Sequence, residues 1–174
     1  IPEDEGGLGM GPVEGMVVME ELGRGIVPEP LAQSFIAGAV IAGHADEDTK
    51  DNWLPRIAGG QALVVLAYQE RKARYRLDIC EAKAAKAGEA WALSGTKSLV
   101  TMGDQADAFV VSARVGGAAD DAGGIALFLV ERPAAGVKTR GYALQDGSRA
   151  AEVTLADTPA TLLVAAGPAF AALE

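Results

Sequence analysis

The sequence has 174 residues, the size of one domain with part of a second, and 49% of them are hydrophobic, which is enough to form a core. Its formal net charge of −9 argues against a nucleic-acid or anionic-membrane partner, and no apolar run approaches the roughly 18–20 residues of a membrane span. Cys80 is the only cysteine, so we expect no internal disulfide, no thiolate metal site, and a reducing, cytoplasmic setting.

The first sixty residues have the apolar spacing of helices. The pattern predicts a helix from residue 12 that Gly23 and Gly25 stop, a second over residues 30–42 that ends at Gly43, and a third over residues 46–58 that ends at Gly59 and Gly60. Pro12 suits the first position of a helix, and the acidic residues that open the third helix are favoured there by the helix dipole.

After Gly60 the sequence changes to short β-rich runs separated by glycine and aspartate. The expected strands are residues 62–68, 77–84, 90–93, 109–113, 125–130 and 151–155. Residues 86–89 are expected to form a turn, and a new helix is expected from about Gly167. Strands at this spacing favour a sandwich or barrel over βαβ units.

Five segments keep the order and spacing of one enzyme family. They are residues 1–9 before the first helix, 20–24 at its end, 50–60 before the β region, 93–97 in a hairpin and 106–114 in the next strand. No single segment is specific, but together, and in register over nearly the whole chain, they resemble the acyl-CoA dehydrogenase family.

The resemblance implies an α+β fold, with a helical segment followed by an antiparallel β-barrel or sandwich. Residues 1–60 would be the C-terminal part of the family's N-terminal helical domain, residues 61–162 its middle β-domain, and residues 163–174 the start of its C-terminal helical domain. On this interpretation the chain is a fragment that stops before the segment with the family's catalytic glutamate.

The resemblance also implies a reaction, the flavin-dependent α,β-dehydrogenation of an acyl-CoA thioester. A glutamate removes the α-proton while the β-hydrogen leaves as hydride to the flavin of FAD. The implied partners are the acyl-CoA substrate, an electron-transfer acceptor protein, and other subunits of a homo- or hetero-oligomer. Because the base lies beyond Glu174 in the family, we assign no catalytic residue and expect the fragment alone to be inactive. Glu70 falls where the family has a glutamate that is not the base.

Two segments correspond to those that contact the flavin in the family. The residues expected to bind the cofactor are Leu66, Tyr68 and Gln69 on the first segment, and Leu99, Val100 and Thr101 on the second. Gln69 replaces a threonine but can still donate and accept hydrogen bonds. Thr101 keeps the hydroxyl expected near flavin N5, while Leu99 replaces a tryptophan that packs on the ring. The FAD site is expected to be incomplete in this fragment.

A larger departure follows Glu70, where Arg74 and Tyr75 replace a glycine and a serine of the family within a run of four cations at residues 71–76. This variation resembles the small subunit of pimeloyl-CoA dehydrogenase. In one interpretation Arg74 and Tyr75 bind a phosphate of FAD or CoA, which suits the guanidinium fork. In another, flavin binding is lost, and the chain is a structural partner subunit of a heteromeric acyl-CoA dehydrogenase. The run could also be a solvated loop that balances nearby acids, or a subunit contact.

The other residues that could take part in catalysis or metal binding are expected to have structural roles. His44 is the only histidine, and at the end of a helix it is expected to cap carbonyl groups rather than to act in catalysis. Cys80, Trp53 and Trp91 are expected to be packing residues.

Overall fold

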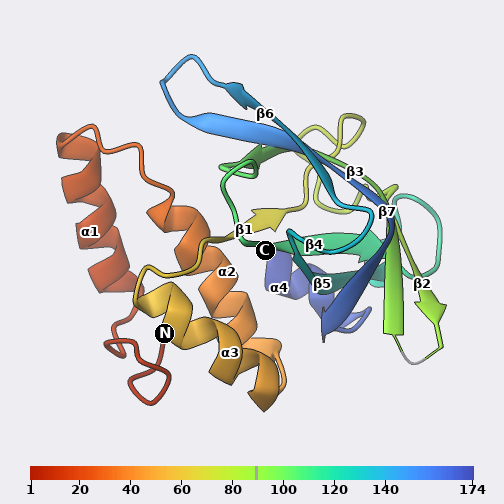
Figure 1. The fold of residues 1–174 in the computed structure, drawn as a ribbon, viewed down its shortest axis with the longest axis horizontal. Coiled ribbons are helices and arrows are strands. Elements are labelled where there is room, and N and C mark those ends of the chain that lie inside the picture. The colour runs from red at the N-terminus through yellow and green to blue at the C-terminus, as the bar shows by residue number, and fades with distance from the viewer. Residues whose placement is uncertain (89) are drawn as a thin grey trace.

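Three helices form the first part of the computed structural model, which describes residues 1–88 and 90–174 (Figure 1). They are α1 (Pro12–Arg24), α2 (Leu31–His44) and α3 (Glu47–Ala58). All three predicted helices are confirmed, and α1 ends at Gly25, one of the two glycines predicted to stop it. Gly23 lies inside α1 and Gly43 inside α2, so these two glycines do not end their helices. Within the described residues, no helix combines the length and the apolar character needed to cross a bilayer.

The start of α3 follows from a side-chain cap. Asp46 has extended backbone, and its carboxylate accepts a hydrogen bond of 2.8 Å from the main-chain N–H of Thr49. This bond lowers the pKa of Asp46 below its ordinary value. Glu47 and Asp48 follow in the first turn, where the positive end of the helix dipole favours acidic groups.

A seven-stranded sheet forms the rest of the chain and closes on itself as a barrel. Its strands are β1 (Val64–Ala67), β2 (Lys83–Ala87), β3 (Ala90–Thr101), β4 (Ala108–Arg114), β5 (Ile125–Glu131), β6 (Lys138–Ala143) and β7 (Arg149–Val164). The order is β1-β4-β2-β3-β7-β5, and the pairing of β4 with β5 closes the ring. Most pairings are antiparallel, as expected, but β1 and β2 each pair with β4 in parallel. The hairpin of β6 and β7 extends beyond the barrel (Figure 1).

The prediction of a strand at residues 77–84 is wrong for most of its length, because β2 begins only at Lys83. The main chain of the preceding segment is bonded largely to side chains, and its main-chain bond to a strand is the one from the Arg114 N–H of β4 to the Ala82 carbonyl. The Glu70 carboxylate accepts from the N–H groups of Glu81 and Ala82, and the Arg114 guanidinium donates to carbonyls in the same segment.

Two other predictions for the β region need correction. The predicted turn at residues 86–89 begins late, since Lys86 and Ala87 belong to β2, and Glu89 lies outside the described residues. Strand β6 was not predicted, because its side chains are polar or only partly buried. The expected last helix is confirmed as α4 (Pro168–Leu173).

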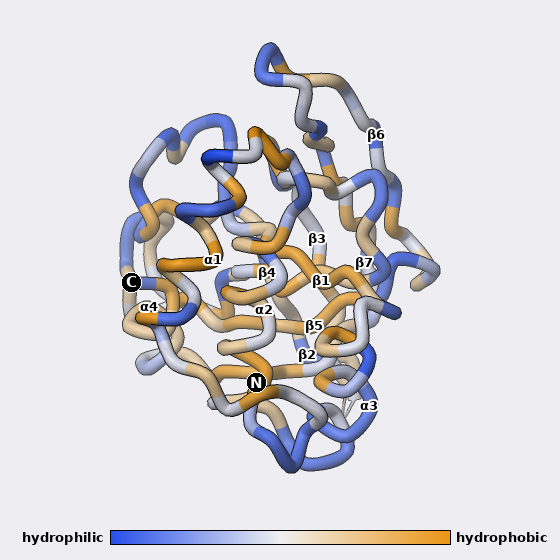
Figure 2. The backbone as a smooth tube through the Cα atoms, turned by 90° about the vertical axis from the view of Figure 1, so that its left-hand side faces the viewer, coloured by the Kyte–Doolittle hydropathy of each residue, from blue (hydrophilic) through white to orange (hydrophobic). Residues whose placement is uncertain are grey.

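The sheet has an apolar cluster on each face. Inside the barrel, the fully buried side chains include Val65, Phe109 and Phe128. On the outside, alternate residues of β1, β4 and β5 pack against α2, α3 and α4. Because both faces are covered, β4 and β5 are apolar along nearly their whole length, and the hydropathy colouring follows them (Figure 2).

Three residues expected to serve packing do so. Cys80 is 1% exposed in a small cluster with Ala82 and Ile125, and burial raises the pKa of its thiol. Trp53 is buried in the core beneath the helices. Trp91 packs edge-on against Phe128, with 5.4 Å between the ring centroids.

Candidate functional site

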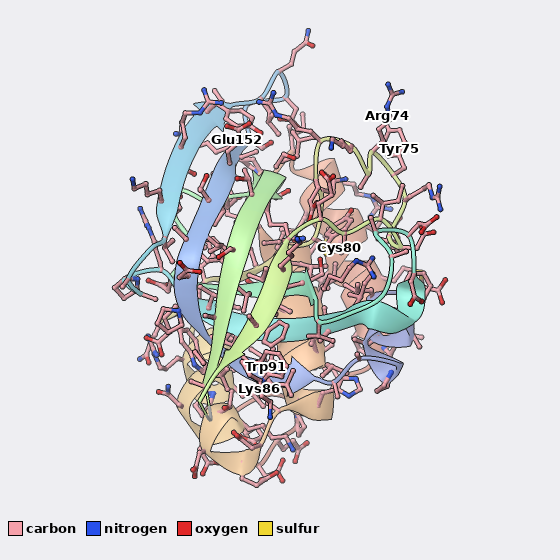
Figure 3. The ribbon with its side chains drawn as sticks, turned by 90° about the vertical axis from the view of Figure 1, so that its right-hand side faces the viewer. Arg74, Tyr75, Cys80, Lys86, Trp91 and Glu152 are labelled. Atoms are coloured by element: carbon pink, nitrogen blue, oxygen red, sulfur yellow. The ribbon has the colours of Figure 1, made fainter. Side chains whose placement is uncertain are left out.

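A groove of about 500 Å³ lies between the loop of residues 69–76, strand β3 and the hairpin of β6 and β7. Four of the residues predicted to bind a cofactor or a phosphate line it, namely Gln69, Arg74, Tyr75 and Leu99. The other residues on its wall include Tyr142 of β6 and Glu152 of β7. Figure 3 shows Arg74 and Tyr75 extending from the loop, with Glu152 on the neighbouring hairpin.

The remaining predicted site residues lie elsewhere. Leu66 and Tyr68 line a second hollow of about 600 Å³, formed with α2 and the C-terminal residues. Val100 is 1% exposed, so its side chain belongs to the barrel core, and a ligand could reach only its main chain. Thr101 is half-buried at the end of β3 and lines neither hollow.

A main-chain hydrogen bond joins the two segments that meet at the groove. The N–H of Ser98 donates to the carbonyl of Gln69 over 2.9 Å. The next residue, Leu99, has φ +52°, at an irregularity in the pairing of β3 with β7. This left-handed conformation costs roughly 1–2 kcal/mol for a residue other than glycine. It leaves Leu99 54% exposed between two buried neighbours, so an apolar side chain faces the groove.

Arg74 also has left-handed backbone, with φ +52°. A glycine, which the sequence resemblance implies for this position, would adopt this conformation without strain. The neighbouring Tyr75 is 94% exposed. The loop therefore keeps a backbone suited to glycine while it presents a cation and an aromatic ring.

Three of the four cations in the loop have acidic partners. Lys72 Nζ lies 2.8 Å from Glu81, Arg76 Nε lies 3.0 Å from Asp78, and Arg71 Nε lies 3.1 Å from Glu152. Arg74 has no ion-pair partner within the part of the chain that the structure describes. For Arg71, Lys72 and Arg76 the structure favours the interpretation that they balance nearby acids.

Glu152 holds two arginines at the edge of the groove. It accepts a hydrogen bond of 2.6 Å from Arg140 on the paired strand β6, and it also accepts from Arg71 in the loop. Hydrogen bonds from Arg140 and then from Arg71 lower the pKa of Glu152 below its ordinary value. The carboxylate thus links the loop to the hairpin.

Glu70 belongs to the wall of the groove, but its side chain is buried and makes many hydrogen bonds. Its carboxylate lies 2.7 Å from Lys97 Nζ and accepts from the N–H groups of Glu81 and Ala82 over 2.7 and 3.0 Å. Burial tends to raise the pKa of Glu70, but the charge of Lys97 and these hydrogen bonds outweigh it, so the pKa lies below its ordinary value. An ionised carboxylate with these partners is a poor proton acceptor.

Lys97 was missed by the sequence analysis. Its side chain is 0% exposed, and its Nζ also lies 3.1 Å from Ser112 Oγ. Strand alternation could have indicated it, because Lys97 has the same parity along β3 as the buried Leu93. Glu152 and Tyr142 were also missed, since nothing near them in the sequence indicates that their hairpin reaches the groove.

Comparison with protein families gives two adjacent matches. Residues 1–61 match the model of the acyl-CoA dehydrogenase N-terminal domain, and residues 66–157 match that of the acyl-CoA dehydrogenase middle domain.

Curated relatives carry related names. Acyl-CoA dehydrogenase FadE29 of Mycobacterium tuberculosis is 28% identical over 88% of this chain and 40% of its own length. The (2S)-methylsuccinyl-CoA dehydrogenase of Cereibacter sphaeroides is 30% identical over 76% of this chain and 24% of its own. The mitochondrial isovaleryl-CoA dehydrogenase of Pongo abelii is 32% identical over 79% of this chain and 34% of its own. The chain thus spans less than half the length of these relatives.

Solved structures agree with the fold. An acyl-CoA dehydrogenase from Geobacillus kaustophilus superimposes with a TM-score of 0.89 at 27% identity, over 99% of this chain and 48% of that one. The Tcur3481-Tcur3483 steroid ACAD G363A variant gives a TM-score of 0.87 at 29% identity, over 99% of this chain and 45% of that one. The agreement of both domain matches with these structures shows that the chain belongs to the acyl-CoA dehydrogenase family.

Proposed function

We propose that the full-length protein is an FAD-dependent acyl-CoA dehydrogenase, to which this chain contributes the end of the N-terminal helical domain and the middle β-domain. The observation that carries the proposal is the meeting of two chain segments at one groove, where Gln69 and Leu99 lie on adjoining backbone. The named relatives act on acyl-CoA thioesters according to their names, which supports the same substrate class here.

The residues of the groove fit a planar ring with a polar edge. The Gln69 amide both donates and accepts, so it would hold a ring edge that carries carbonyl and N–H groups. Leu99 would cover part of a ring face with its exposed side chain. Thr101, at the end of β3, would offer a hydroxyl. When bound, FAD supplies the hydride-accepting chemistry of the reaction.

Arg74 is proposed to bind a phosphate of FAD or CoA, with Tyr75 beside it. Its guanidinium is the one in the loop that lacks an ion-pair partner among the described residues. A guanidinium matches phosphate oxygens with two parallel hydrogen bonds. The three other cations would hold the loop in place through their own acidic partners.

No residue of this chain is proposed as the catalytic base. Glu70 is 5% exposed and surrounded by donors, so it would not take an α-proton from a substrate. The base would come from the C-terminal helical domain, as the family resemblance implies. Electrons would pass to an acceptor protein, and the FAD site would be completed by that domain and by another subunit.

The side chains of the same loop support a second candidate function, that of a structural subunit. Arg74 and Tyr75 place bulky side chains where the family has glycine and serine, and Leu99 offers less surface than a tryptophan. The chain would then belong to a structural subunit that binds no flavin, in a heteromeric dehydrogenase. One similar structure carries a name that pairs two proteins, the Tcur3481-Tcur3483 steroid ACAD.

An absorption spectrum of the full-length protein decides between these functions. Flavin bands near roughly 370 and 450 nm in the protein purified alone would support a self-sufficient dehydrogenase. Flavin found only after purification with a partner subunit would support the structural role. No flavin in either preparation would contradict the first proposal.

Arg74→Gly tests the phosphate contact without straining the loop, since glycine accepts φ +52°. Loss of a charge-assisted contact worth about 1.5–3 kcal/mol should weaken flavin or acyl-CoA binding by roughly 10- to 100-fold. Arg132→Gly, at an exposed turn outside the groove, is the matched control and should change neither affinity. Equal affinities for both variants would contradict the contact.

A further inference from the structure

A buried ion pair connects four segments of the barrel at the wall of the groove. The Glu70 and Lys97 side chains are 4% and 0% exposed and lie 2.7 Å apart. Glu70 follows β1, and its carboxylate also holds the main chain just before β2. Lys97 belongs to β3 and reaches Ser112 on β4 over 3.1 Å and the Tyr68 carbonyl over 3.4 Å.

Both members of the pair are next to groove residues in the sequence. Glu70 lies between Gln69 and Arg71, and all three residues line the groove. Lys97 does not line the groove, but it precedes Ser98 and Leu99, which do. The Ser98 N–H donates to the Gln69 carbonyl within the same unit. The relative placement of the two groove segments is therefore set by the ion pair and this main-chain hydrogen bond together.

We infer that Glu70 and Lys97 are positioning residues, which hold the two ligand-facing segments in the arrangement that binds the flavin edge. The inference rests on the proposed function. Both side chains are almost inaccessible and are engaged by protein groups, so the inferred role is positional and includes no proton transfer.

Stability alone is a weak reason for such a pair. Replacing a buried ion pair with well-packed hydrophobic side chains of similar volume is often neutral or stabilising, because folding must remove both charges of the pair from water. Directional bonds from Lys97 Nζ to Glu70, Ser112 and Tyr68 fix the backbone in a way that apolar packing does not. The pair is thus expected to serve the geometry of the groove more than the free energy of folding.

The test uses the full-length protein with the double variant Glu70→Gln plus Lys97→Met, which removes both charges and keeps the approximate volumes. The control carries the same substitutions at a pair on α3 whose glutamate is exposed and whose lysine is half-buried, Glu47→Gln plus Lys50→Met. Three quantities are measured, namely the urea midpoint, the affinity for FAD with its visible spectrum, and hydrogen–deuterium exchange of the peptide that contains the Ser98 amide.

The expected result for the double variant is a urea midpoint lowered less than in Lys97→Met alone, because no unpaired charge remains although the glutamine amide can accept from only one of the two N–H groups. FAD binding should be at least tenfold weaker, and the Ser98 peptide should exchange at least tenfold faster. The control should match the parent in all three. Unchanged exchange and unchanged FAD affinity in a folded double variant would overturn the inference, and so would a double variant that does not fold. If the parent protein binds no flavin, the proposed function fails, and exchange at Ser98 alone decides the inference.

Discussion

Replacing Lys97 alone with methionine would leave the Glu70 carboxylate buried beside an apolar side chain. The two charged atoms lie 2.7 Å apart and both side chains are almost inaccessible to water, so solvent cannot replace the lost cation. Breaking a buried pair by removing one member typically costs about 3–5 kcal/mol. The N–H groups of Glu81 and Ala82 still donate to the carboxylate, which places the expected loss near the lower end, about 3 kcal/mol.

The loss of unfolding free energy in Lys97→Met should be larger at neutral pH than at acidic pH. In the parent chain the pKa of Glu70 is lowered by folding, so the stability that this group adds is present above its unfolded-state pKa and is lost as pH falls through the folded value. Without Lys97, burial dominates and raises the pKa of Glu70 in the folded variant. The variant then loses most unfolding free energy at neutral pH, where Glu70 is ionised. The loss becomes smaller as pH falls through the raised pKa of Glu70.

Urea unfolding at pH 7.5 and at pH 5.5 measures this effect. Lys97→Met should lose about 3 kcal/mol at pH 7.5 and distinctly less at pH 5.5. Lys50→Met, which removes the half-buried partner of the exposed Glu47, should change stability by less than about 1 kcal/mol at either pH. A loss for Lys97→Met below 1 kcal/mol at pH 7.5, or an equal loss at both pH values, would refute the electrostatic reasoning.

Three further substitutions test the barrel and the groove. Phe128→Ala removes a 0% exposed ring from inside the barrel and should lower the unfolding free energy by about 3–5 kcal/mol, with a change in Trp91 fluorescence because the two rings are in contact. Gly95→Ala places a new Cβ 2.7 Å from the Ala82 main chain at φ +153° and should lose about 1–3 kcal/mol in the same urea assay. Leu99→Gly relieves left-handed strain, so its unfolding free energy should change by no more than about 1 kcal/mol, while flavin binding weakens through the lost apolar contact.

The parts of the fold that local pattern determines could be predicted from the sequence. Strands β4 and β5 lie between two apolar layers, so their continuous apolar runs indicate them directly. Helix α3 has an acidic cap and ends at glycine, as the sequence indicates. Residues 77–82 could not be predicted, because their main chain is held by Glu70 and Arg114, and these contacts depend on the closed barrel.

The candidate site also contains residues that could be predicted from the sequence and residues that could not. Family resemblance indicated Gln69, Arg74 and Leu99, and all three line one groove. Glu152 reaches that groove only because β6 and β7 form a long hairpin beside the loop, and strand β6 has too little apolar pattern to be recognised. The acidic partners of the loop's cations differ in the same way. Asp78 is close in sequence to Arg76, whereas Glu152 is distant from Arg71.

Three residues other than glycine with left-handed backbone lie in or beside the ligand-facing segments, namely Arg74, Leu99 and Met102, with φ between 52° and 54°. Such conformations persist where the surrounding structure determines them, and they concentrate at functional sites. Here Leu99 and Met102 flank the end of β3, which is held by β7, by the Glu70–Lys97 pair and by a hydrogen bond from the Met102 N–H to the Arg149 carbonyl. The backbone at the groove is thus set by the barrel, whereas its chemistry is set by the side chains of Arg74, Tyr75 and Leu99. It follows that substitutions such as Arg74→Gly and Leu99→Gly should alter ligand binding with little effect on folding, while substitution of Lys97 alone should alter both.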